Sequence, residues 1–103
     1  MKPFTPTARQ RGLFFTLAPA YVWWKSPDEA IRYPYHLLAR IMDTGTIEDI
    51  AQVMAIFDKS TLREVVANAE AGWFRPNSWH LWHYWLGLAD FDAVPLLPKR
   101  VFH

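Results

Sequence analysis

The sequence contains no cysteine, only four scattered glycines and no long apolar run. The lack of cysteine excludes a disulfide framework, thiolate metal ligands and a thiol nucleophile, and it fits a reducing compartment. The scattered glycines form no phosphate-binding loop. No segment approaches the roughly 18–20 apolar residues of a membrane-spanning helix, and residues 1–15 lack the apolar centre of a signal peptide. We therefore expect a cytoplasmic protein with no membrane partner.

Aromatic side chains, by contrast, are unusually common. They make up 17% of the 103 residues and include six tryptophans. A chain of this length forms one domain, and folding buries only about 60–70% of the surface that the unfolded chain exposes. Not every ring can be enclosed, so we expect some of them to lie at a surface, in a groove or at a contact with another chain.

The formal net charge is +1, but it is unevenly distributed. Residues 1–25 carry four basic side chains and no acid, whereas residues 26–72 carry eight acids against four basic side chains. The basic segment could contact phosphate or an acidic partner. The simpler interpretation is a solvated, partly irregular N-terminal arm, and we favour it.

Helix signals begin at SPDE. Ser26 is typical of an N-cap, with proline at the first helical position and Glu29 placed to close a capping box. Pro34 then interrupts, because proline disfavours a helical residue before it and lacks an amide donor. We expect one short helix at 27–33 and a second from 34 to about 43.

Two further helices follow closely. Thr46 is a predicted cap for a helix at 47–57 whose apolar residues recur at helical spacing. Thr61 and Glu64 have the spacing of a capping box and predict a helix at 61–71.

Pro76 begins an aromatic helix that should reach Leu88, and the prolines beyond it predict an extended tail. The predicted fold is all-α, a small bundle of four to five short helices. We divide the chain into a basic, irregular arm (1–25), a helical domain (26–90) and the tail (91–103).

The aromatic helix contains NSWHLWHYWLGL, which has three tryptophans, two histidines and a tyrosine. Successive residues of a helix are about 100° apart around its axis, so one half of this helix is apolar. That half contains Leu81, Trp82, Trp85, Leu86 and Leu88, and Trp79 lies at its edge. The other half carries His80, His83, Tyr84 and Gly87. A helix with two such faces is either central to the bundle or shared with another chain.

Catalysis and metal binding are not indicated. His80 and His83 are three residues apart and could reach one point, but a zinc site needs three or four ligands and no metal motif surrounds them. All three serines lie at predicted helix starts, where capping explains them. His80 with Tyr84 could in principle transfer protons, yet no substrate is suggested. We expect no metal, no cofactor and no enzymatic activity.

The predicted helices at 35–43, 47–57 and 61–71 could also form a helix-turn-helix motif. The recognition helix would present Lys59, Thr61, Arg63 and Asn68 to DNA. Glu64 and Glu70 make that face nearly neutral, which opposes attraction to phosphates. An ordinary helical core is therefore the favoured interpretation, and DNA binding is the alternative.

Three segments carry a resemblance: HLLARIMDTGTIEDIAQVMAIF, LREVVANAEAGWFRPNSWHLWHYWLGL and PLLPKRVF. Over residues 36–103 they resemble a group of small bacterial proteins with G-T/D-x-x-D, R-E-V/A, S-W/R-x-x-W/F-H and L-P-x-R motifs. The genes of that group often lie beside those of nucleotidyltransferase-type toxins of the abortive-infection class. The resemblance implies an antitoxin-like protein that binds and neutralises a toxin enzyme. The chain lacks a separate DNA-binding domain, which puts autoregulation in doubt.

Both lines of reasoning predict a non-catalytic protein that binds a protein partner or a second copy of itself. Interface anchors favour tryptophan and tyrosine. The predicted anchors are Trp73, Phe74, Trp79, His80, Trp82, His83, Tyr84 and Trp85. Trp23 and Trp24 are a second candidate patch, and core packing is the competing explanation for each ring.

Overall fold

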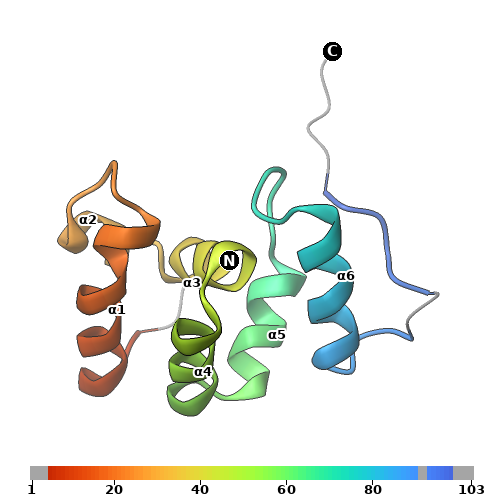
Figure 1. Ribbon diagram of the computed structural model, residues 1–103, viewed down its shortest axis with the longest axis horizontal. Coiled ribbons are helices and arrows are strands. Elements are labelled where there is room, and N and C mark those ends of the chain that lie inside the picture. The colour runs from red at the N-terminus through yellow and green to blue at the C-terminus, as the bar shows by residue number, and fades with distance from the viewer. Residues whose placement is uncertain (1–4, 91–92, 99–103) are drawn as a thin grey trace.

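The computed structural model describes residues 5–90 and 93–98. Over these residues the chain is all-helical, with six helices and no β-strand. In chain order they are α1 (Ala8–Tyr21), α2 (Pro27–Ile31), α3 (Pro34–Thr44), α4 (Ile47–Ile56), α5 (Lys59–Ala67) and α6 (Pro76–Trp85) (Figure 1). The prediction of an all-α protein is confirmed, but the described part has one helix more than the upper estimate.

Helix α3 lies at the centre and packs against each of the other five helices. Its apolar stripe is buried as the sequence predicts: Leu37, Leu38, Ile41 and Met42. Burying a side chain of this size stabilises the fold by about 1.5–3 kcal/mol. The remaining helices surround α3, with α1 on one side and α5 and α6 on the other (Figure 1).

The predicted helix starts are largely confirmed. The Ser26 hydroxyl accepts a hydrogen bond from the Glu29 amide (3.2 Å), and the Thr46 hydroxyl accepts one from the Asp49 amide (3.1 Å). Prolines occupy the first position of α2, α3 and α6, where the missing amide donor costs nothing. Local chemistry therefore determines where these helices begin.

The prediction of an irregular segment before residue 26 is wrong for residues 8–21, which form α1. Thr7 and Gln10 make a reciprocal capping box at its start. The helix continues through the exposed Pro19 because its inner face is held in the core by Leu13, Phe14, Leu17, Ala18 and Tyr21. Packing of this face outweighs the backbone hydrogen bond that proline removes.

The boundaries of α5 and α6 also differ from prediction. Helix α5 begins at Lys59, since Asp58 already has the extended backbone of an N-cap, and it ends at Ala67. Helix α6 ends at Trp85 instead of Leu88. Gly87 has φ +67°, its amide donates to the Tyr84 carbonyl (3.1 Å), and the Leu88 amide donates to the His83 carbonyl (2.9 Å). These two bonds define a Schellman motif, which requires a left-handed residue that glycine adopts without strain.

The tail is non-helical over residues 93–98, in agreement with prediction. Val94 and Leu97 pack against the core, and the Pro95 carbonyl accepts a hydrogen bond from the Trp79 indole (2.7 Å). The rest of the predicted tail, residues 91–92 and 99–103, lies outside the described residues.

Candidate functional site

One face of α6 is part of the core. Four of its residues, spaced i, i+3, i+4 and i+7, are buried: Trp79, Trp82, His83 and Leu86. The Trp82 indole donates to the Met42 carbonyl at 2.9 Å, and His83 Nδ1 donates to the Trp79 carbonyl at 2.8 Å. Their polar atoms thus bond within the fold, which makes the burial of these amphiphilic rings favourable.

The opposite face of α6 carries a second stripe at the same spacing. It consists of Leu81 (40% exposed), Tyr84 (55%), Trp85 (47%) and Leu88 (40%), and we call it the α6 stripe. Trp85 rests edge-on against the buried Trp82, with 5.4 Å between ring centroids. The stripe contains no charged residue and is the largest exposed apolar feature of α6.

The buried face of α6 coincides with neither its apolar half nor its histidine–tyrosine half. Trp79 and His83 are buried, whereas Leu81, Trp85 and Leu88 are exposed. Residue type does not decide which face is buried, because the Trp79 and Trp82 indoles donate hydrogen bonds to distant carbonyl groups, which stabilises these rings inside.

The eight predicted anchors consequently separate into two groups. Phe74, Trp79, Trp82 and His83 are buried in the chain's own core and are not available on its surface. Tyr84 and Trp85 are exposed, and Trp73 and His80 are partly buried. The exposed members define a smaller candidate interface than the sequence predicts.

The second predicted patch, Trp23 and Trp24, belongs to a larger group of rings. The ring centroids of Trp23 and Trp24 lie 5.6 Å apart, those of Trp24 and His36 lie 6.5 Å apart, and those of His36 and Trp73 lie 5.4 Å apart. Two cations stack on rings of this region, Arg40 on Trp24 (5.5 Å) and Lys25 on Tyr33 (4.4 Å). We call these seven residues the aromatic–basic cluster.

Sequence reasoning missed most of this cluster, because its members come from the α1–α2 connection, the start of α3 and the α5–α6 connection. Both connections lie along the upper edge of the molecule in Figure 1. The only signal in the sequence was the run YVWWK. Burial lowers the pKa of His36, and the positive charges of Lys25 and Arg40 lower it further. The imidazole is thus held neutral among the cations.

Two adjoining cavities border the cluster. One, of about 270 Å³, is lined by Arg32, Tyr33, Pro34, Tyr35, His36, Glu70 and Trp73. The other, of about 380 Å³, is lined by His36, Glu70, Ala71, Gly72 and Trp73. His36, Glu70 and Trp73 line both of these cavities.

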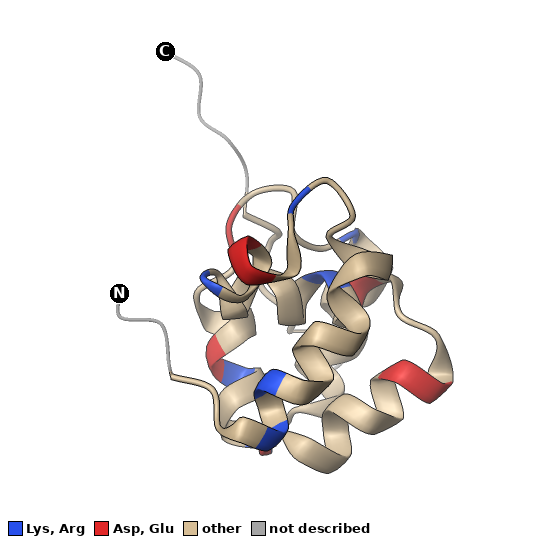
Figure 2. Cartoon of the chain, turned by 90° about the vertical axis from the view of Figure 1, so that its left-hand side faces the viewer, with Lys and Arg blue, Asp and Glu red and all other residues tan. Residues whose placement is uncertain are grey.

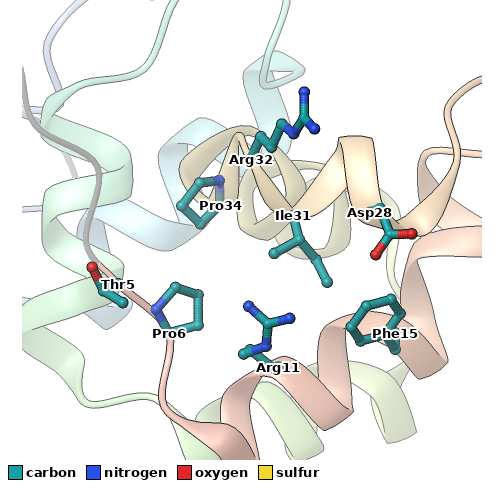
Figure 3. A pocket seen from close by; sticks show the side chains of 8 residues that line it. All are labelled: Thr5, Pro6, Arg11, Phe15, Asp28, Ile31, Arg32 and Pro34. Carbon is teal, nitrogen blue, oxygen red and sulfur yellow. The ribbon is translucent and has the colours of Figure 1, made fainter.

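A separate cavity of about 580 Å³ lies between α1 and the α2–α3 junction (Figure 3). Arg11 and Ile31 point into it, whereas the Arg32 side chain points away (Figure 3). Its only acidic lining residue is Asp28, and no histidine or serine lines it.

Two of the residues predicted for DNA binding, Lys59 and Arg63, are exposed cations, and the exposed Glu64 follows Arg63 in the chain. The Arg63 guanidinium Nε donates to the Leu86 carbonyl at the end of α6 (2.7 Å), and the Asn68 amide donates to the Glu64 carbonyl (2.9 Å). Lys59 is exposed and Thr61 is partly buried. On the α1 side of the molecule, which faces the viewer in Figure 2, acidic and basic positions are interspersed.

Among residues 5–90 and 93–98, no three histidine, aspartate or glutamate side chains gather closely enough to bind a metal ion. Within the same ranges, none of the helices combines the length and hydrophobicity that crossing a bilayer requires. No protein-family model, curated protein or solved structure matches the chain at a significant level. The candidate sites are consequently the α6 stripe and the aromatic–basic cluster.

Proposed function

We propose that this chain is a non-catalytic, cytoplasmic protein-binding domain, the antitoxin component of a bacterial toxin–antitoxin pair. The α6 stripe is the observation that carries the protein-binding part of the proposal. The chain completes a core with the opposite face of α6 and still exposes Leu81, Tyr84 and Trp85 on one face of the helix, with Leu88 exposed just beyond its end. Such a face fits the groove of a partner, as in helix-in-groove recognition.

The stripe has the composition of an interface centre. Charged residues are depleted at such centres, and tryptophan and tyrosine are enriched. Trp85 is supported from behind by Trp82, so the ring is held in place before a partner arrives. A pre-ordered anchor loses less conformational entropy on binding than a free one.

The antitoxin part rests on the resemblance over residues 36–103, which suggests a toxin enzyme encoded by a neighbouring gene as the partner. The DNA-binding alternative has less support. Arg63, its main candidate for phosphate contact, is engaged by the Leu86 carbonyl. The exposed Glu64 beside Arg63 offsets its charge and weakens the alternative further.

Co-expression tests the proposal. The tagged chain is purified together with the product of each neighbouring gene, and the mass of the eluted species is measured by light scattering. We expect a heterocomplex of fixed stoichiometry. Trp85→Ala should weaken it by about 30-fold or more, the loss typical of an interface hot spot.

Leu81→Glu provides a second variant, because it places a charge on the stripe while keeping a residue that favours helix. Ile47→Ala is the matched control, since Ile47 is an apolar residue 85% exposed on α4. A complex that survives both stripe substitutions with unchanged affinity contradicts the proposed interface. A failure of every neighbouring product to bind contradicts the antitoxin assignment.

A further inference from the structure

The aromatic–basic cluster differs from the α6 stripe in its chemistry. Exposed rings alternate with cations: Trp23 is 74% exposed, Trp24 48% and Tyr33 56%, while Lys25 and Arg40 stack on their neighbours. Interface centres between proteins tend to exclude charge, so this alternation does not suit a protein groove. It is typical of surfaces that bind bases through their faces and phosphates through their charges.

The cations of this surface are not neutralised by carboxylates, although Arg40 Nε donates a hydrogen bond to the Tyr21 carbonyl (3.3 Å). Lys25, Arg32 and Arg40 form no ion pair with any carboxylate in the described residues. Glu70 is the one acidic group that lines the adjoining cavities. The surface therefore has three positive charges against one negative charge, although the whole chain is close to neutral.

The cavity beside the cluster accepts a flat group. It has a volume of about 270 Å³ and is bordered by Tyr33, His36 and Trp73, with Arg32 at its rim. A ring that entered it would have aromatic faces to stack on and a guanidinium within reach of its phosphate. Glu70 could accept a hydrogen bond from an exocyclic amino group, as acidic side chains do with cytosine.

We propose that the aromatic–basic cluster binds single-stranded nucleic acid, with one base in the cavity at Trp73 and flanking nucleotides along Trp24 and Tyr33. A duplex is disfavoured, because its bases already stack on one another and do not expose their faces. A quaternary ammonium ligand is disfavoured as well, because the positive charges of Lys25 and Arg40 lie at these rings and repel a second cation. This proposal is independent of the α6 stripe and of the antitoxin assignment.

Fluorescence anisotropy of a labelled oligo-deoxycytidine of about ten nucleotides tests the proposal. The full chain should bind it saturably, and the affinity should fall steeply with salt. Tyr33→Ala should weaken binding by at least about fivefold, the lower end of the effect of losing one stacked base. Arg32→Gln should reduce the slope of log affinity against log salt by about 0.7, the value for one phosphate contact on a single strand.

Tyr33 and Arg32 are both exposed, so neither substitution removes a core contact. Ile47→Ala serves as the control for a lost exposed apolar side chain outside both surfaces and should leave the affinity unchanged. Four results overturn the proposal: no saturable binding, equal binding of the matched duplex, equal binding of cytidine monophosphate, or an affinity indifferent to both Tyr33→Ala and Trp73→Ala. These results do not depend on whether the chain forms a complex with a protein partner or on whether Trp85→Ala weakens that complex.

Discussion

Asp43 joins the end of α3 to the beginning of α6 through both its carboxylate and its carbonyl group. Its Oδ1 accepts a hydrogen bond from the Arg75 amide (3.0 Å) and pairs with the Arg75 guanidinium (3.3 Å). Its carbonyl accepts from Arg75 Nη2 (2.7 Å) and from the Ser78 hydroxyl (3.2 Å). Because Arg75, the N-cap of α6, has no capping side-chain bond of its own, Asp43 supplies the cap from another helix.

Asp43→Ala should lower the free energy of unfolding by about 1–3 kcal/mol, because it leaves a partly buried amide without its acceptor. The charge pair itself contributes little, since the Arg75 side chain is 67% exposed. Urea denaturation followed by circular dichroism measures the change. Asp43→Asn is the matched control and should retain most of the stability, because its amide oxygen still accepts from Arg75. If both variants lower the free energy of unfolding equally, the capping role is contradicted and the charge of Asp43 is the stabilising feature.

At the scale of the helices, local capping signals predict correctly where most of the helices begin. Tertiary packing decides which face of a helix is buried. Ser26 and Thr46 act within three residues of themselves, so their caps can be identified from the sequence alone. The bonds that select the buried face of α6 come from Met42 and Pro95, 40 and 16 residues away. The periodicity of α6 does not contain that information, which is why the sequence alone does not determine which face of α6 is buried.

Helix α1 illustrates the opposite error, in which one local signal was given too much weight. Its basic charge and lack of acidic residues favour an irregular arm, although Thr7 and Gln10 have the spacing of a capping box. Tyr21 then fixes the end of the helix, because its hydroxyl donates to Asp49 (2.6 Å) and accepts from the Thr46 amide (3.2 Å). Burial and the bond to Asp49 both raise the pKa of Tyr21. The segment predicted as an arm is therefore part of the core.

Removal of residues 1–21 should abolish cooperative unfolding. The deletion takes five buried side chains from the core, and Leu13, Phe14 and Leu17 alone contribute about 1.5–3 kcal/mol each. Their sum of about 4.5–9 kcal/mol is comparable to the 5–15 kcal/mol stability of a typical domain. Thermal denaturation by circular dichroism tests this. Thr7→Ala is the graded control and should cost only about 1 kcal/mol, the usual value of an N-cap. A sharp transition in the shortened chain contradicts the contribution of α1 to the core and supports the interpretation of this segment as an arm.

For the molecule as a whole, the important property is that one core reaches every helix. The buried cluster runs from Leu13 in α1 to Leu86 just after α6, and the tail adds Val94 and Leu97 to it. The exposed rings are additional to this core and are not needed to complete it. Recognition by either surface is then docking of a preformed face, which avoids the ordering cost of a segment that folds on binding.

The isolated full-length chain should therefore unfold in urea in a single transition. Far-UV circular dichroism reports all the helices, whereas tryptophan fluorescence reports mainly α6, its surroundings and the aromatic–basic cluster; both should give the same midpoint if one core unites them. The dependence on urea should be about 1 kcal/mol/M, the lower value for small proteins. A fluorescence transition that precedes the loss of helix means that α6 and the tail unfold separately. In that case the α6 stripe is not fully ordered in the isolated chain, and binding of the partner must order it.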